Sequence, residues 1–332
     1  MKQLASSLVL LGLSGILHGQ EPHGLTLKRT IDLPAVTGKF DHFAMDLDGN
    51  RLFASAGGAH AIEITDLASG KIIESLPGIG KPHGLAWIAS KRRLFVADGA
   101  KGELDVFEGS PLKRIAAIAL SEDADDMVYD DQSHLLYVGH GGTDAANPAR
   151  VAVVDAETLK LVAELSVASH PEALEFDRKH DRILINVADS GQIAVIDGKS
   201  HSITAIWSLG TSKGNTPLAY DAMQDLLLVG CRTPAQIVVL DGKDGRVIAK
   251  ASSDAGADDL FFDATERRAY LIAGSGAVDA YSLSAQGELT PLSVTHTAAG
   301  AKTGLLDEAG HALYVGVPGI DGAAVVRVYE TQ

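Results

Sequence analysis

The chain has 332 residues, of which 46% are hydrophobic and 21% are charged, and its formal net charge is −15. This composition is typical of a folded globular protein with an acidic surface. Because 43 acidic residues outnumber 28 basic ones, the chain lacks the clustered positive charge that nucleic acid binding requires, and we expect no nucleic acid partner.

The N-terminal residues have the pattern of a secretory signal peptide. Lys2 precedes an apolar run from Leu4 to Leu17, which is shorter than the roughly 20 residues that a transmembrane helix needs. We expect cleavage after Gly19, so that residues 1–19 are the signal peptide and residues 20–332 the mature chain. No second apolar stretch of membrane length follows, which predicts a periplasmic or secreted protein without a membrane span.

Cysteine usage excludes several classes of site. Cys231 is the only cysteine in the chain, so no internal disulfide can form. A single thiol also excludes a CxxCH haem attachment and a cysteine-based zinc cluster. Cys231 follows the apolar run Leu226–Gly230, where a free cysteine usually acts as a small apolar side chain.

A repeated unit occupies the rest of the chain and predicts an all-β fold. A short apolar strand leads to a polar turn and then to a strand such as RLFAS (Arg51–Ser55) or LLYVG (Leu135–Gly139). A polar loop and a further alternating strand follow, and strict alternation with β-branched residues is the pattern of a β-strand. This further strand occurs seven times, at Ala61–Asp66, Glu103–Glu108, Arg150–Asp155, Gln192–Asp197, Gln236–Asp241, Ala277–Ser282 and Val325–Glu330.

Seven units with four strands each predict a seven-bladed β-propeller of antiparallel blades in a single domain. The seventh unit ends shortly after its third strand, whereas Leu25–Leu33 precedes the first unit and has no unit of its own. We therefore expect this N-terminal strand to complete the last blade and to close the ring.

Five segments carry a resemblance to a known family: FDHFAMD (Phe40–Asp46), PHGLAW (Pro82–Trp87), DADDMVYD (Asp123–Asp130), HPEALEFD (His170–Asp177) and ADDLFFD (Ala257–Asp263). In these, the chain resembles the YncE-like, YVTN-repeat family of bacterial exported propellers. The resemblance implies the propeller fold and export, but no particular chemistry, because propellers host many unrelated activities.

Alignment of the units places a ring of ionisable side chains at one mouth of the central channel. The innermost strand of a propeller blade starts near the axis, so equivalent positions from different blades converge there. The first position of this ring reads Asp41, His83, Asp125, Glu172, Thr216, Asp258 and Lys302, and the second reads His42, Gly84, Asp126, Ala173, Pro217, Asp259 and Thr303.

The loops between the second and third strands open on the same face. They are expected to bring His60, His140 and Arg232 to the rim, together with an insertion in the third unit at Gly141–Pro148. Insertions on a binding face commonly shape a ligand site. We therefore predict ligand binding by the ionisable ring residues and Arg232.

Three interpretations of this mouth remain open from the sequence. In the first, the ring residues satisfy one another and nearby backbone groups, and the propeller is an interaction scaffold for a protein partner. In the second, the mouth binds a small ligand or a divalent metal ion, which is the candidate cofactor. Its candidate metal ligands are Asp41, His83, Asp125, Glu172 and Asp258, with His42 as a further nitrogen donor.

The third interpretation is a metal-assisted lyase or hydrolase that uses the same mouth. His42 and His83 are then the candidate catalytic bases, because imidazole titrates near neutral pH. Arg232 or Lys302 would bind an anionic substrate. No GxSxG or SxxK element is present to indicate nucleophilic catalysis.

Overall fold

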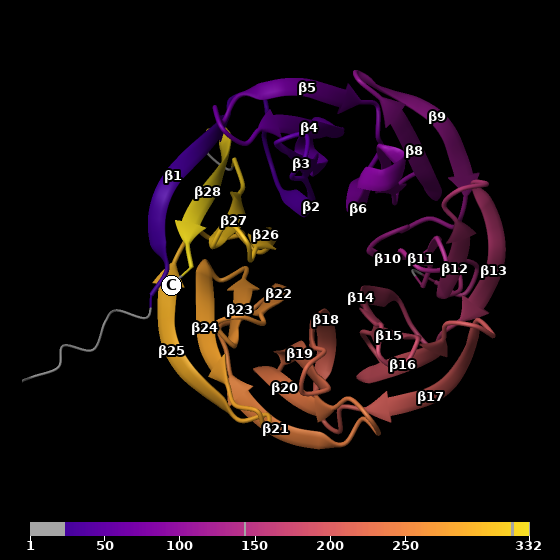
Figure 1. The fold of residues 1–332 in the computed structure, drawn as a ribbon, viewed down its shortest axis with the longest axis vertical. Coiled ribbons are helices and arrows are strands. Elements are labelled where there is room, and N and C mark those ends of the chain that lie inside the picture. The colour runs from indigo at the N-terminus through magenta and orange to yellow at the C-terminus, as the bar shows by residue number, and fades with distance from the viewer. Residues whose placement is uncertain (1–23, 143, 320–321, 332) are drawn as a thin grey trace, which may run out of the picture.

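The computed structural model describes residues 24–142, 144–319 and 322–331, and the predicted signal peptide lies outside them. In these residues, 28 strands form seven four-stranded antiparallel sheets around a central axis (Figure 1). The predicted all-β, seven-bladed propeller is confirmed. Within the described ranges, no helix has the length and apolar character needed to cross a membrane.

Each blade places one strand at the axis and one at the circumference. The inner strands are β2 (Phe40–Asp46), β6 (Pro82–Ile88), β10 (Met127–Asp130), β14 (Pro171–Asp177), β18 (Lys213–Asp221), β22 (Ala257–Asp263) and β26 (Gly304–Asp307). The second strands are β3 (Arg51–Ala56), β7 (Arg93–Asp98), β11 (Leu135–His140), β15 (Arg182–Val187), β19 (Leu226–Thr233), β23 (Arg268–Ala273) and β27 (Ala312–Val317).

The third strands coincide with the seven predicted alternating segments to within one residue. They are β4 (Ala61–Asp66), β8 (Glu103–Gly109), β12 (Arg150–Asp155), β16 (Gln192–Asp197), β20 (Ala235–Asp241), β24 (Ala277–Leu283) and β28 (Ala324–Glu330). The outer strands are β5 (Ile72–Pro77), β9 (Leu112–Ala119), β13 (Lys160–Ser166), β17 (Ser202–Ser208), β21 (Val247–Ser252), β25 (Leu289–His296) and β1 (Thr26–Leu33). Two short 3₁₀ helices, η1 (Gly57–Ala59) and η2 (Ala89–Lys91), follow β3 and β6.

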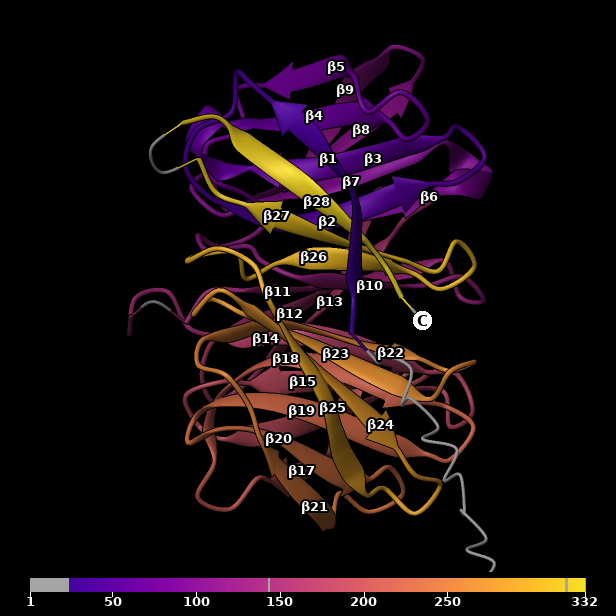
Figure 2. The same cartoon turned by 90° about the vertical axis from the view of Figure 1, so that its left-hand side faces the viewer.

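The N-terminal strand closes the ring as expected. β1 pairs antiparallel with β28, from Thr26 opposite Glu330 to Leu33 opposite Ala324. Its sheet has the order β1-β28-β27-β26, so the last blade contains both ends of the described chain (Figure 2). This pairing covers the edge of β28 that would otherwise be unpaired.

The apolar side chains pack between neighbouring blades. One cluster, for example, joins Phe95 and Val106 of the second blade to Leu136 and Ala152 of the third, and all four are fully buried. Because both faces of the second and third strands are covered in this way, these strands are nearly continuous apolar runs. The clusters hold the inner strands at fixed positions around the axis.

The Asp that ends most inner strands explains why the sequence units could be aligned. Asp46 accepts a hydrogen bond from the backbone N of Gly49 at 3.0 Å, and Asp263 accepts one from Thr265 at 2.9 Å. Asp130, Asp177, Asp221 and Asp307 bond the turns that follow them in the same manner. An Asp that caps this turn is a local structural requirement, and it fixes the register of the ring residues five positions earlier.

Candidate functional site

The inner strands deviate from regular pairing where they reach the mouth. Register shifts occur between Phe40 and Phe43 in β2, and at the equivalent places in β6, β14, β18 and β22. A bulge of this kind interrupts the alternation of side chains and re-aims them. Two consecutive residues, Asp41 and His42, therefore both line the central cavity.

This cavity has a volume of about 500 Å³ and contains most of the predicted site. Its ionisable lining consists of Lys39, Asp41, His42, His60, Lys81, His83, Asp125, Glu172, Arg232, Asp258 and Lys302. The predicted ring residues Asp126 and Asp259 are not part of this lining, and their charges act on His42. The lining contains four carboxylates and four Lys or Arg side chains, whose formal charges cancel. The net charge of the cavity therefore depends on the protonation of its imidazoles.

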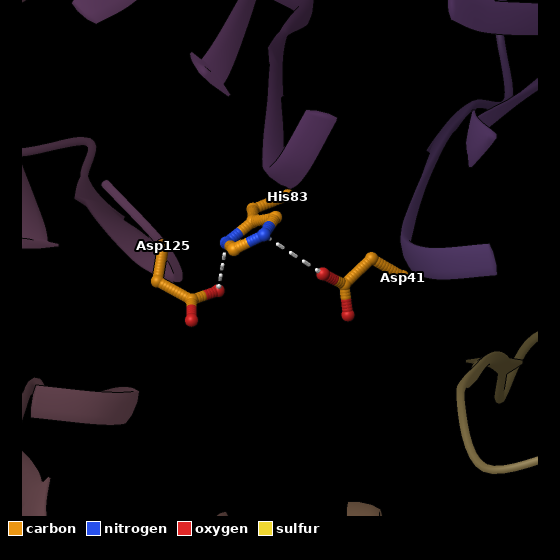
Figure 3. A group of neighbouring side chains, drawn as sticks. All are labelled: Asp41, His83 and Asp125. Carbon is orange, nitrogen blue, oxygen red and sulfur yellow. Dashed lines mark ion pairs between the residues drawn. The ribbon is translucent and has the colours of Figure 1, made fainter. Parts of the chain in front are cut away.

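His83 lies between two carboxylates (Figure 3). Its Nδ1 is 3.1 Å from Asp125 Oδ1 and its Nε2 is 3.6 Å from Asp41 Oδ2. Nδ1 is buried and makes no hydrogen bond of good geometry. A ligand atom from each of the three residues lies within 4.8 Å of the other two, so the group could hold a metal ion.

Close backbone packing fixes the position of this imidazole. Only 5% of His83 is exposed, and its backbone oxygen accepts a hydrogen bond from Ser55 at 2.5 Å. A Cβ at Gly99 would come within 3.2 Å of His83 Cε1, and one at Gly84 within 2.5 Å of the Asp125 backbone oxygen. Glycine at position 99 leaves room for the His83 ring, and glycine at position 84 allows the second and third blades to approach closely.

His170 joins the site although the sequence analysis did not select it. Its Nε2 lies 3.3 Å from Asp125 Oδ2, and its Nδ1 lies 2.6 Å from the backbone oxygen of Gly141. Asp125, His170 and Glu172 form a second group whose ligand atoms lie within 4.8 Å of one another. His170 precedes β14 and is outside the strand positions that we aligned. The sequence feature that indicates His170 is its position two residues before the ring residue Glu172, where it faces the insertion that begins at Gly141.

The imidazoles stabilise the negative charge of Asp125. Burial would raise the pKa of this carboxyl, but the contacts with His170 and His83 and the charge of His42 hold it well below 3.8. Conversely, burial lowers the pKa of His170, while Asp125 and the Gly141 carbonyl outweigh it and raise the value to about 9. Burial together with the charge of Asp125 raises the pKa of Glu172 to about 7.

His42 lies among four carboxylates, two of which line the cavity with it. Its Nδ1 is 3.7 Å from Asp259 Oδ1 and its Nε2 is 3.9 Å from Asp125 Oδ1. Burial lowers the pKa of His42, but the charges of Asp126, Asp259, Asp41 and Asp125 raise it to about 10. Burial raises the pKa of Asp259 to about 7, and that of Asp126 in the same direction. His42 is therefore a cation at neutral pH in this arrangement.

Asp258 belongs to a separate part of the mouth. Its Oδ1 pairs with Arg232 Nη2 and its Oδ2 pairs with Lys302 Nζ. Arg232 Nε also donates to the backbone oxygen of Ala257 at 2.9 Å. The two oxygens of Asp258 are thus neutralised by cations, and this residue is in neither of the two groups centred on Asp125.

The remaining rim residues divide into exposed and buried ones. His60 lines the cavity, with its Nδ1 2.6 Å from the Gly80 backbone oxygen. His140 is instead completely buried, and its Nδ1 accepts a hydrogen bond from the Ser121 backbone N at 3.1 Å. Burial lowers the pKa of His140 to about 4. The rim prediction for His140 is wrong, because the side chain packs inside the blade at the end of β11.

A third group, Asp177, His180 and Asp225, lies outside the mouth, where β14 ends and the turns begin. Arg182 Nε is 2.7 Å from Asp177 Oδ2, and Lys179 Nζ is 3.8 Å from Asp225 Oδ2. These cations already compensate the carboxylates, so we regard the group as a link between the fourth and fifth blades.

Comparison with known proteins supports the fold and no finer assignment. No family model matches the chain, and no curated protein matches it. Among solved structures, a chain of the "Crystal Structure of Mitotic Checkpoint Complex" matches with a TM-score of 0.78 at 13% identity, covering 99% of this chain and 98% of that one. The likeness shows the fold alone. Since 1701 solved chains match this chain, the architecture is widespread and does not indicate a function.

Proposed function

We propose that the propeller binds a divalent metal ion at its mouth through Asp41, His83 and Asp125. The observation that carries the proposal is the position of the His83 ring between two carboxylates, with Nδ1 facing Asp125 and Nε2 facing Asp41, and with no hydrogen bond of good geometry at the buried Nδ1. A buried polar atom without a partner is costly unless a ligand satisfies it. One imidazole with two carboxylates is also an ordinary donor set for a metal ion.

The donor atoms favour a first-row transition ion. Imidazole nitrogen suits zinc, copper, iron and nickel, whereas carboxylate oxygen alone suits magnesium, calcium and manganese. A site with both kinds of donor therefore favours Zn²⁺ or Mn²⁺ over calcium. The cavity of about 500 Å³ leaves room beside the ion for a small ligand, as is typical of small-molecule sites.

Export and family membership are part of the same proposal. The signal peptide pattern at residues 1–19 and the resemblance to YncE-like propellers support a periplasmic or secreted location. Fractionation of cells that express the full chain would test this. We expect the mature protein outside the cytoplasm with residue 20 at its N-terminus, and a full-length cytoplasmic product would contradict export.

The interpretation as a metal-assisted lyase or hydrolase receives less support. A catalytic base must be unprotonated, but in the metal-free protein His42 has a pKa raised to about 10, and the carboxylates beside His83 also raise the pKa of that residue against the effect of burial. Of the three interpretations, metal binding accounts best for the arrangement of His83.

Metal content and thermal unfolding test the proposal. Protein purified without chelator is expected to contain a bound transition metal, and a metal at 100 times its Kd should stabilise the fold by about 2.7 kcal/mol. His83→Asn should reduce both the metal content and the metal-induced stabilisation. His60→Asn is the matched control, because His60 lines the same cavity outside both groups and its φ of 52° suits Asn. Metal content and metal-induced stabilisation that are undiminished in His83→Asn would refute the proposed site.

A further inference from the structure

The carboxylate of Asp125 faces an imidazole on each side. Oδ1 lies 3.1 Å from Nδ1 of His83, and Oδ2 lies 3.3 Å from Nε2 of His170. Asp125 comes from the third blade, and the two histidines come from the second and the fourth. Asp125 belongs to both groups of potential metal ligands, and each of its two oxygens faces the imidazole of one group.

The backbone selects which nitrogen of His170 faces Asp125. A carbonyl oxygen only accepts hydrogen bonds, so the 2.6 Å contact with Gly141 places a proton on Nδ1 of His170. In the neutral ring, the lone pair is then on Nε2, directed at the carboxylate. Histidines that bind metals commonly donate their other ring N–H to a backbone carbonyl, which orients the ring.

Glu172 supplies a carboxylate on the same side. It lies within the register shift between Pro171 and Leu174 in β14, and it lines the cavity together with Asp125. The donor set Asp125, His170 and Glu172 repeats the combination of one imidazole and two carboxylates that Asp41, His83 and Asp125 provide.

We propose that the mouth is a two-metal centre, in which Asp125 bridges one ion bound by Asp41 and His83 to a second ion bound by His170 and Glu172, and which binds a small phosphate. This inference rests on the proposed metal binding and extends it. Protein sites with two metals hold the ions about 3.5–4 Å apart, a spacing that a single bridging carboxylate can span.

The rest of the cavity favours an anion as the external ligand. Two dications would turn the balanced charge of the lining strongly positive. Arg232 and Lys302 lie in the same cavity, held by Asp258. Among the described residues, Nη1 of Arg232 donates to no protein group, so this nitrogen can donate to a phosphate oxygen. A tetrahedral phosphate has oxygens for both ions and for the guanidinium.

Counting the ions tests the two-metal centre. Chelator-treated protein titrated with Mn²⁺ is expected to bind two ions per chain, and His170→Asn and His83→Asn are each expected to bind one. His60→Asn should bind two. Unfolding curves of the metal-free variants show whether each is folded. One ion in the wild type and an unchanged count in His170→Asn would overturn the second site but leave the proposed function standing, whereas no bound ion would overturn both.

Spectroscopy and phosphate binding test the bridge and the ligand. The electron paramagnetic resonance spectrum of the Mn²⁺-loaded protein should show two coupled ions, and His170→Asn should show an isolated ion. Uncoupled spectra at two ions per chain would overturn the bridging role of Asp125. Inorganic phosphate should raise the Tm of the loaded wild type, with a smaller rise in Arg232→Gln. An equal rise in the metal-free protein would overturn phosphate binding by the metal pair.

Discussion

Glu175 provides a sharp test of how burial sets the charges near the axis. It lies three residues beyond Glu172 in β14, at a repeat position that is apolar in the other six blades: Ala44, Ala86, Val128, Ala219, Phe261 and Leu305. Each of those six belongs to, or packs against, the apolar cluster between its blade and the next. Glu175 therefore places a carboxyl where the fold otherwise has a hydrocarbon side chain.

The pKa of Glu175 gives the direction and size of the effect. Burial, together with the charge of Asp126, raises this pKa from 4.5 to about 8. The folded state thus retains a proton that the unfolded chain has already lost, so the contribution of Glu175 to stability is greatest below pH 4.5 and is lost as the pH rises to about 8. At 1.36 kcal/mol per pKa unit the full loss is roughly 5 kcal/mol, and the partial exposure of Glu175 reduces our expectation to about 2–3 kcal/mol.

Urea unfolding at pH 5 and at pH 9 measures this loss. Glu175→Gln keeps the size of the side chain and removes the titration, so the variant should exceed the wild type in stability at pH 9 by about 2–3 kcal/mol. Glu288→Gln, at an exposed position, is the control for a general effect of removing one negative charge. The reasoning is refuted if wild type and Glu175→Gln lose the same free energy of unfolding between the two pH values.

Two further substitutions test the packing that supports the mouth. Asn186 is fully buried, donates a hydrogen bond to the Thr216 backbone oxygen at 2.8 Å and accepts one from Asn215 at 2.7 Å. Asn186→Ala should therefore lower the free energy of unfolding, measured in urea, by about 2–4 kcal/mol. A loss below about 0.5 kcal/mol would contradict this role. Gly84→Ala should cost about 1–3 kcal/mol and weaken metal binding, because its Cβ would lie 2.5 Å from the Asp125 backbone oxygen. Gly322→Ala, which meets nothing within 4 Å, should be neutral by the same measurement.

The fold could be predicted from the sequence because each blade repeats the same local requirements. Alternating strands, a turn Asp and a Gly-rich loop recur at a nearly constant period, so an error in one unit is corrected by the others. Closure by β1 followed from the absence of an outer strand in the last unit, and the pairing of Thr26 to Leu33 with β28 confirms it.

The site could be predicted only where it follows the repeat. Asp41, His83 and Asp125 occupy equivalent strand positions, and the structure brings them together. His170 enters from a loop whose course depends on the insertion after Gly141, and no period marks that loop. The pairing of Asp258 with Arg232 and Lys302 depends on side chains that reach across blades, which the alignment of strand positions does not specify.

The distribution of charge explains how one mouth can contain so many carboxylates. Arg232 and Lys302 neutralise Asp258 on one side, so that side is complete without a ligand. On the other side, the cationic partners of Asp125 among the described residues are imidazoles, at distances of 3.1 to 3.9 Å. Imidazole compensates a carboxylate only with a proton or with a metal ion bound between them. An added metal ion is therefore stabilised most on the side of the mouth around Asp125. Arg232 and Lys302, which pair with Asp258, can still interact with an anion that binds beside the metal ion.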